Sequence, residues 1–139
     1  MKHHATHLAL CLLLGVFSLQ GQVIVANHSV KATEISKSEV RAIFLGESNA
    51  LKDGSHVVPV LLKTGQVHEE FLKEYIGKNP TSFLAGWRTI MFSGRGTIPA
   101  SFDTESALLD YIASNPGAIG YIGEDAKGKA QKVKILTAK

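Results

Sequence analysis

One segment near the C-terminus turns a helix end directly into a buried strand: residues 115–122, with the sequence NPGAIGYI. Gly117 can adopt the left-handed conformation that ends many helices. Residues 118–122 form a short apolar run of strand length, interrupted only by Gly120. Gly120 indicates that another backbone approaches the strand closely at this point. A helix that leads at once into such a strand points to an α/β binding domain.

The N-terminus has the features of an export signal. Lys2 provides a positive charge, and residues 8–19 form an apolar stretch that is too short to span a bilayer comfortably. Small or polar residues follow, so we expect cleavage after Gly21, with Gln22 as the first mature residue; a cut after Ala26 would fall inside a strand. The sequence therefore predicts a cleavable signal peptide over residues 1–21, a periplasmic location, and no membrane span after cleavage.

The chain has one cysteine, Cys11, and it lies inside the predicted signal. A lipoprotein needs its cysteine after the apolar stretch with small residues just before it, whereas Leu10 precedes Cys11 and the apolar run continues beyond it. The mature chain would then have no cysteine. This excludes disulfides, thiolate metal sites and a thiol nucleophile.

Residues 22–139 have the length of one domain with a single core. The formal net charge is +3, and several lysines gather near the C-terminus, namely Lys127, Lys129, Lys132, Lys134 and Lys139. No aromatic side chains alternate with these lysines, which favours a solubilised surface over a nucleic-acid interface. We therefore expect no nucleic-acid partner.

Hydrophobic spacing and capping signals predict alternating strands and helices along this domain. Ser36 with Glu39 three residues later forms a capping box for a helix that reaches about Phe44. The other expected elements are strands at 23–25, at 57–62 with an irregularity at Pro59, at 118–122 and at 133–136, and helices at 67–76, from Pro80 onward, and from a cap at Asp103 to Ser114. The helix after Pro80 carries a predicted core stripe of Phe83, Leu84, Trp87, Ile90 and Met91, and the helix before Ser114 is expected to bury Ala107, Leu108, Tyr111 and Ile112. This alternation predicts an α/β fold with a mixed, mainly parallel sheet flanked by helices.

An ordered series of short motifs resembles one family over nearly the whole mature chain. The series consists of residues 36–46 (SKSEVRAIFLG), 53–54 (DG), 57–60 (VVPV), 71–72 (FL), Trp87, 92–96 (FSGRG) and 116–121 (PGAIGY). Together these look like the second lobe of the phosphate-binding proteins that feed ABC uptake systems, a branch of the type II periplasmic binding proteins. The resemblance implies a single periplasmic-binding-protein-type lobe, because such proteins are two-lobed and residues 22–139 have room for one lobe.

The same resemblance implies where an oxyanion would bind. In that family the second lobe holds phosphate with a Ser-Gly-Thr run at a helix start, usually with an arginine a few residues upstream. The run falls on Gly65, Gln66 and Val67 in this chain, and the arginine position falls near Leu61, so neither hydroxyl and no arginine is kept. Backbone N–H groups and the helix dipole still favour an anion at such a helix start.

The candidate ligand residues lie in two loops. The first offers donors from Lys63, Thr64, the Gly65 backbone, Gln66 and His68, beside Val67, and the second offers Ser93, Gly94 and Arg95 within residues 93–97. Glu69 and Glu70 oppose a divalent anion at the first loop, so an ordinary capped turn is the alternative. We interpret His68 as a surface residue at the helix start, and not as a pH sensor or a metal ligand.

Catalytic motifs are not convincing anywhere in the sequence. Residues 46–50 (GESNA) resemble a nucleophile elbow but follow a helix instead of a strand, and residues 93–97 lack the lysine–hydroxyl pair of a phosphate loop. His28, His56 and His68 are not at metal-ligand spacing. We expect no enzyme, no metal and no cofactor. Two functions stay open: a module that weakly binds phosphate or a related oxyanion, and a ligand-free interaction module that contacts an envelope partner or forms a homodimer.

Overall fold

The computed structural model describes residues 21–139, so the predicted signal peptide falls almost entirely outside the described residues. The elements in chain order are β1 (Val23–Ala26), β2 (Glu34–Ile35), α1 (Lys37–Phe44), β3 (Val58–Pro59), β4 (Leu61–Leu62), α2 (Gln66–Phe71), the π-helical turn η1 (Leu72–Ile76), α3 (Pro80–Phe92), β5 (Ser101–Phe102), α4 (Glu105–Ser114), β6 (Ala118–Ile122), the 3₁₀ segment η2 (Glu124–Lys129) and β7 (Lys134–Ala138). Within this part of the chain, no helix is both long and apolar enough to cross a membrane.

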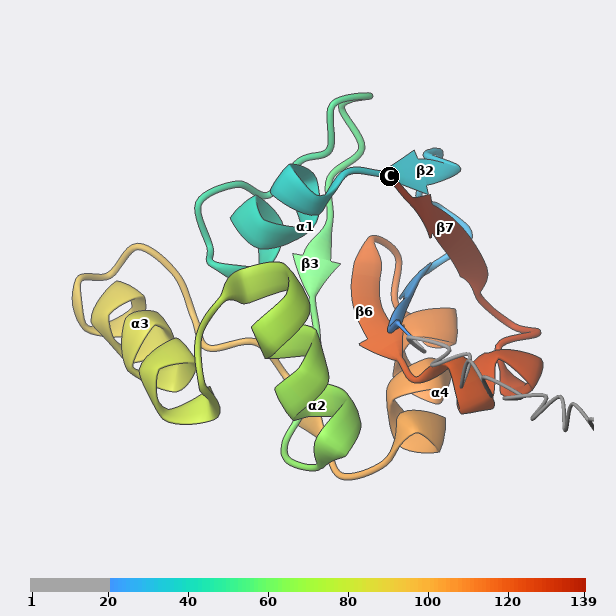
Figure 1. Ribbon diagram of the computed structural model, residues 1–139. Helices are drawn as coiled ribbons and strands as arrows, with labels where there is room; N and C mark the ends of the chain where they lie inside the picture. The colour runs from blue at the N-terminus through green and yellow to red at the C-terminus, as the bar shows by residue number, and fades with distance from the viewer. Residues whose placement is uncertain (1–20) are drawn as a thin grey trace, which may run out of the picture.

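A mixed sheet with helices around it forms the centre of the molecule (Figure 1). Its strand order is β2-β7-β1-β6-β3, and β4 and β5 form a separate parallel pair. The predicted α/β fold with a mixed sheet flanked by helices is therefore confirmed, but the expectation that this sheet is mainly parallel is wrong. The longest ladders are antiparallel, because β1 pairs with both β6 and β7 in that sense. The parallel pairings, β2 with β7, β3 with β6 and β4 with β5, are each two residues long.

The predicted strand over residues 57–62 is irregular at Pro59, as expected, and it divides between the two sheets. The N–H groups of Val58 and Val60 donate to Gly117 and Ile119 beside β6, at 2.9 and 2.8 Å. The N–H groups of Leu61 and Lys63 donate instead to the carbonyls of Ala100 and Phe102, on the side of β5, both at 2.9 Å. Proline has no N–H to contribute to a ladder, which suits a position where the pairing changes sides.

Capping side chains fix the helix starts. Ser36 and Glu39 form the predicted capping box at α1. The predicted cap of α4 is wrong by one residue: the Thr104 side chain, and not that of Asp103, accepts from the Ala107 N–H at 3.1 Å. The inward face of α4 also differs, since Leu108, Leu109 and Ile112 are buried, Ala107 is exposed and Tyr111 is half-buried.

The predicted core stripe of α3 is only partly correct. Phe83 and Trp87 are buried, whereas Leu84 and Ile90 are half-buried and Met91 is 39% exposed. The reason is visible in Figure 1, where α3 projects from the side of the molecule. A helix attached by one part of its surface buries a narrower stripe than one laid along a sheet.

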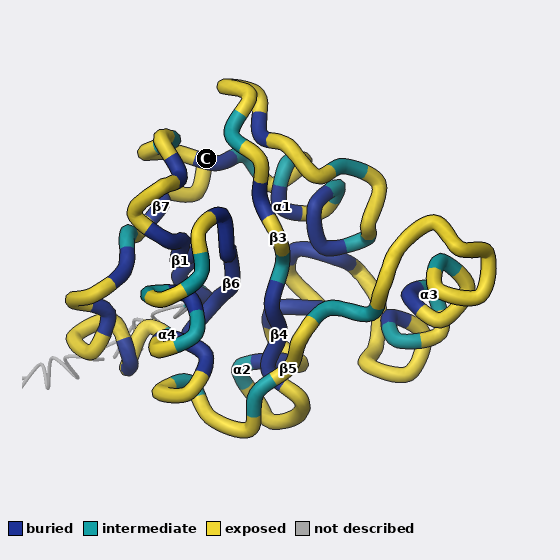
Figure 2. Tube along the Cα trace, turned by 180° about the vertical axis from the view of Figure 1, so that it is seen from behind, coloured by how far each residue is buried: buried dark blue, intermediate teal, exposed yellow. Residues whose placement is uncertain are grey.

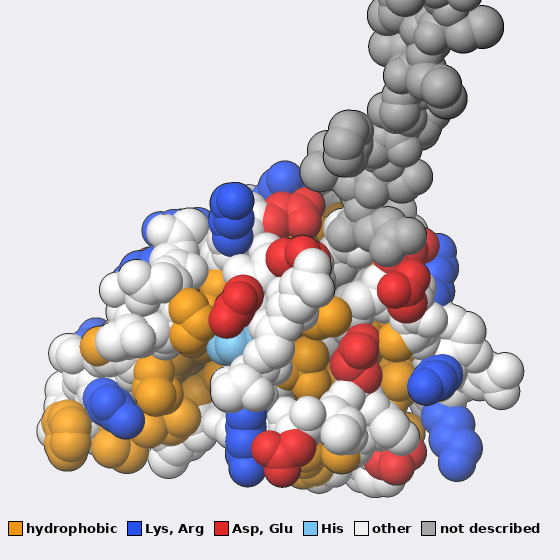
Figure 3. All heavy atoms as spheres, turned by 60° about the horizontal axis from the view of Figure 1, so that its bottom comes forward, with side chains coloured by type: hydrophobic (Ala, Val, Ile, Leu, Met, Phe, Trp, Pro, Cys, Tyr) orange, Lys and Arg blue, Asp and Glu red, His pale blue; other side chains and the backbone are white. Residues whose placement is uncertain are grey.

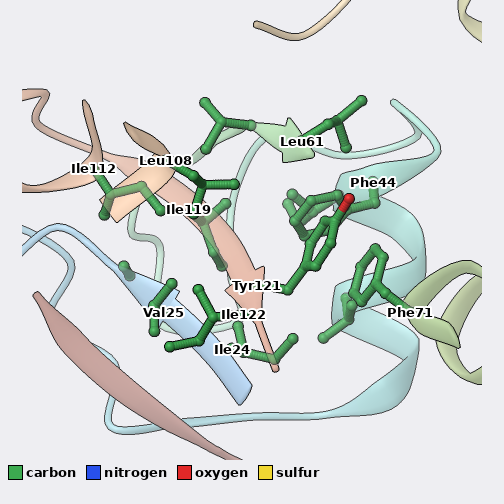
Figure 4. Close-up of a cluster of buried hydrophobic side chains, with 14 of the residues drawn as sticks. Ile24, Val25, Phe44, Leu61, Phe71, Leu108, Ile112, Ile119, Tyr121 and Ile122 are labelled. Atoms are coloured by element: carbon green, nitrogen blue, oxygen red, sulfur yellow. The ribbon is translucent and has the colours of Figure 1, made fainter. Parts of the chain in front are cut away.

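The core lies between the central strands and the surrounding helices, and all five residues of β6 are buried (Figure 2). Tyr121 stacks on Phe71 with ring centroids 3.8 Å apart, beside Phe44 (Figure 4). The close approach expected at Gly120 comes from side chains and not from a backbone, because an added Cβ would lie 2.9 Å from Ile112 Cδ1. Gly117 has the predicted left-handed conformation, with φ of 78°.

Candidate functional site

The first candidate loop connects β4 to α2 at one edge of the fold, where α4 also begins (Figure 1). Gly65 is the N-cap residue of α2, with φ of 102° and ψ of 172°, a conformation open to glycine. Within residues 21–139, no side chain caps this helix start. The first N–H groups of a helix have no partner within the helix, so an uncapped start favours an anion.

The charge of Lys63 is already partly balanced. Its Nζ lies 3.6 Å from Asp103 Oδ1, and the two side chains are 52% and 80% exposed. An ion pair this exposed contributes little to stability and breaks easily, so Lys63 can pair with another anion. Thr64 is exposed beside it.

The Gln66 side chain is turned along the helix and not toward the loop. Its Nε2 donates to Glu70 Oε1 at 2.8 Å, while Gln22 Nε2 donates to the other oxygen of Glu70 at 3.1 Å. Gln66 would therefore offer an anion its backbone N–H. Val67 is half-buried and packs against the core, so its role in the loop is structural.

The interpretation of His68 as a surface residue is wrong: it is only 5% exposed. Its Nδ1 lies 2.5 Å from the Tyr121 hydroxyl oxygen, and the Leu62 N–H donates to the same oxygen at 3.1 Å. Burial lowers the pKa of His68 below its ordinary value of 6.5, against the opposing charge of Glu69. The sequence did show that His68 lies three residues before Phe71 and four before Leu72, on the buried side of the helix.

Acidic groups also surround the neighbouring helix start. The first turn of α4 contains Glu105, whose Oε2 accepts from the Gly123 N–H at 2.8 Å. The Glu105 carboxylate therefore already satisfies the backbone N–H that directly follows β6. Figure 3 shows this edge, the bottom of Figure 1, with acidic and basic side chains interspersed and apolar side chains gathered toward the side where α3 lies.

The second candidate loop belongs to a different place on the molecule. Ser93 and Gly94 end α3, and the Arg95 Nε donates to the Ser93 hydroxyl at 2.9 Å. Arg95 lines a cavity of about 320 Å³ beside Trp87, whereas Lys63 and His68 line another of about 220 Å³. The structure therefore does not bring the two predicted loops into one site. Among residues 21–139, no group of three His, Asp or Glu side chains is placed to hold a metal ion.

The fold of this chain is similar to that of several solved structures. The chain is similar to an ABC-type phosphate transport receptor from Vibrio cholerae (14% identity, TM-score 0.55), to a putative phosphate ABC transporter substrate-binding protein with bound phosphate from Clostridium perfringens (14%, 0.62) and to PstS from Borrelia burgdorferi (12%, 0.58). Each match covers 86% of this chain and 46%, 45% and 47% of the other chain, respectively. No family model and no curated protein matches the sequence.

These matches confirm the predicted fold, which is that of a part of the phosphate ABC transporter substrate-binding proteins named above. The chain spans less than half the length of these three structures, as expected of a single lobe. At this sequence identity the likeness establishes the fold.

Proposed function

We propose that this chain is an exported, single-lobe substrate-binding module, not an enzyme, that holds phosphate or a related small oxyanion weakly at the start of α2. The observation that carries the proposal is the uncapped helix start at Gly65 beside Lys63. In the proposal the anion accepts from the first backbone N–H groups of α2 and from Lys63. The names of the solved structures that share the fold, which refer to phosphate, support this choice of ligand.

Several features make the binding weak. Asp103 competes for Lys63, and Glu69 lies in the first turn of the helix. A single lobe also leaves its ligand open to water, whereas tight sites bury most of a ligand's surface. We therefore expect a dissociation constant of about a millimolar, equivalent to about 4 kcal/mol.

The proposal extends to the compartment. Removal of residues 1–21 would release residues 22–139 into the periplasm, where the binding domain would operate. Mass spectrometry of the secreted protein tests this: a mature chain that starts at Gln22 supports the proposal, and retention of the full chain in the cytoplasm contradicts it.

Isothermal titration of the purified protein with phosphate, and then with sulfate, tests the binding site. The decisive pair of variants is Gln66→Pro and Gln66→Ala. Proline is well tolerated at the first helical position but removes the backbone N–H, whereas alanine removes the side chain only. We expect Gln66→Pro and Lys63→Ala to weaken phosphate binding at least about tenfold and Gln66→Ala to leave it nearly unchanged. Arg95→Ala tests the second loop, which we propose as a separate, weaker anion contact with Ser93 and Gly94.

The outcomes are distinct. Saturable heat that survives Gln66→Pro would move the site away from α2, and its loss in Arg95→Ala alone would move it to residues 93–95. The absence of heat at tens of millimolar phosphate would contradict oxyanion binding altogether.

A specific observation favours the interaction module as the second candidate. Phe92 is 81% exposed and Met91 is 39% exposed at the end of the projecting helix α3. Exposed large apolar side chains that cluster are common at protein contacts. Sedimentation of the protein with and without Phe92→Ser tests whether this helix end makes a homodimer: a concentration-dependent dimer lost in the variant supports it, and a monomer throughout contradicts it.

A further inference from the structure

A cavity of about 220 Å³ lies between the β4–β5 pair and the beginnings of α2 and α3. Its wall is mainly apolar, with Leu62, Phe83, Leu84 and Ile98 among its residues. Three side chains that can donate hydrogen bonds, Lys63, His68 and Ser101, interrupt this wall, and Lys63 and His68 are the two that carry nitrogen donors. An apolar chamber with a few converging polar groups is the usual composition of a small-molecule site.

The hydrogen bonds of His68 determine which ring nitrogen faces the cavity as a donor. Among the described residues the Tyr121 hydroxyl has two partners, and one of them, the Leu62 N–H, can only donate, so His68 Nδ1 is the one acceptor for the hydroxyl hydrogen. The neutral imidazole then has its own hydrogen on Nε2. The structure gives Nδ1 a partner and Nε2 none among the described residues.

This N–H belongs to a residue that lines the cavity. Among the described residues, the only fully buried side-chain polar atom without a partner is Gln22 Oε1, so His68 Nε2, which also has no partner there, is accessible to water. His68 is otherwise 95% buried, and the cavity is the space that it lines. A buried donor without a partner favours a ligand that supplies an acceptor.

The positive charge of Lys63 indicates which kind of acceptor the ligand would supply. Lys63 lines the same cavity, and its pair with Asp103 is exposed and spans 3.6 Å. None of the described residues that line the cavity is acidic. A cation and a neutral N–H donor together favour a carboxylate over a neutral or cationic group.

We infer that this cavity binds a small carboxylic acid with an apolar body of up to about ten heavy atoms. The apolar body contacts Leu62, Phe83 and Leu84, and the carboxylate accepts from His68 Nε2–H and pairs with Lys63. A dry cavity of about 150 Å³ already accommodates benzene. The larger volume here has room for an aromatic ring with a short acidic arm. This ligand goes beyond the proposed inorganic oxyanion, which would contact the backbone at the start of α2.

Phenylacetate is the probe, and ring ¹⁵N resonances of the histidines in the purified protein are the readout. We expect a saturable shift of the His68 Nε2 resonance with a dissociation constant of about a millimolar or tighter. Benzyl alcohol keeps the ring without the charge and acetate keeps the charge without the ring, so each should bind at least about tenfold more weakly. The ¹⁵N spectrum also tests the tautomer directly, because Nδ1 should be the unprotonated nitrogen.

Two variants, Leu84→Trp and Ile98→Phe, each introduce a larger side chain that would fill the cavity. Using both means that the test of phenylacetate binding does not depend on a single substitution. Both replace half-buried side chains, and at least one should fold and lose phenylacetate binding. The variants also separate the two sites: Leu84→Trp should abolish phenylacetate binding and spare phosphate, whereas Gln66→Pro should do the reverse. No His68 shift at 10 times the expected dissociation constant, about 10 mM, would overturn the inference. Unchanged binding in both folded filled variants, or benzyl alcohol binding as tightly as phenylacetate, would also overturn it.

Discussion

The hydroxyl of Tyr121 connects three elements of the core, and its removal is the sharpest test of the packing described above. It accepts from the Leu62 N–H of β4 and bonds to His68 Nδ1 of α2, while its own ring is part of β6. The change Tyr121→Phe keeps the ring stacked on Phe71 and removes only this oxygen. Burial raises the pKa of the Tyr121 hydroxyl, so it stays protonated and able to donate at any ordinary pH.

The expected cost follows from the two groups left behind. Leu62 N–H and His68 Nδ1 each lose their partner in a buried place, and an unsatisfied buried group costs about 1–3 kcal/mol. We expect Tyr121→Phe to lower the free energy of unfolding by about 2–6 kcal/mol, a large part of the roughly 5–15 kcal/mol typical of a domain. With a urea m-value of about 1.5 kcal/mol/M, the unfolding midpoint falls by at least about 1 M.

Tyr75→Phe is the matched control. Tyr75 is 6% exposed, so its ring is also buried, but its hydroxyl makes no hydrogen bond with the described residues. Chemical unfolding followed by circular dichroism should show little change in this variant. If Tyr121→Phe and Tyr75→Phe shift the midpoint equally, the three-element hydrogen-bond network does not stabilise the fold and the reasoning is refuted.

Three further predictions concern the site and the core. Because burial lowers the pKa of His68 in the folded state, the unfolded chain binds more protons below pH 6.5; the free energy of unfolding should fall as the pH drops through that value, and less so in His68→Gln. Asp103→Asn should release Lys63 and tighten phosphate binding about threefold by titration; an unchanged or weaker affinity would contradict the role of that pair. Gly120→Ala should cost about 1–3 kcal/mol in urea unfolding because its Cβ would lie 2.9 Å from a side chain of α4, whereas Gly86→Ala, with open space around it, should not destabilise.

The sequence predicted the elements that local chemistry determines. The capping box at Ser36, the left-handed Gly117 and the irregular strand at Pro59 all occur as expected, because each depends on a few adjacent residues. The wholly buried β6 was also predictable, since an apolar run interrupted only by Gly120 has no polar face to expose.

What the sequence did not predict depends on tertiary placement. Met91 has the right spacing for the core, but α3 projects from the fold and leaves it exposed. His68 is polar and near a helix start, yet its partner is Tyr121, a residue far along the chain. The separation of Lys63 from Arg95 into different cavities likewise follows from the path of α3, which no local pattern encodes.

The pairing of β1 has a consequence for when the protein can fold. This first strand pairs with β6 and β7, whose residues lie almost a whole chain length away. Contacts of such long sequence separation slow folding, because the chain must lose the entropy of closing a large loop before it gains them. The central sheet therefore cannot assemble on the ribosome until the last strand has emerged. A chain that stays unfolded for this long remains competent for translocation, in keeping with the export that we propose.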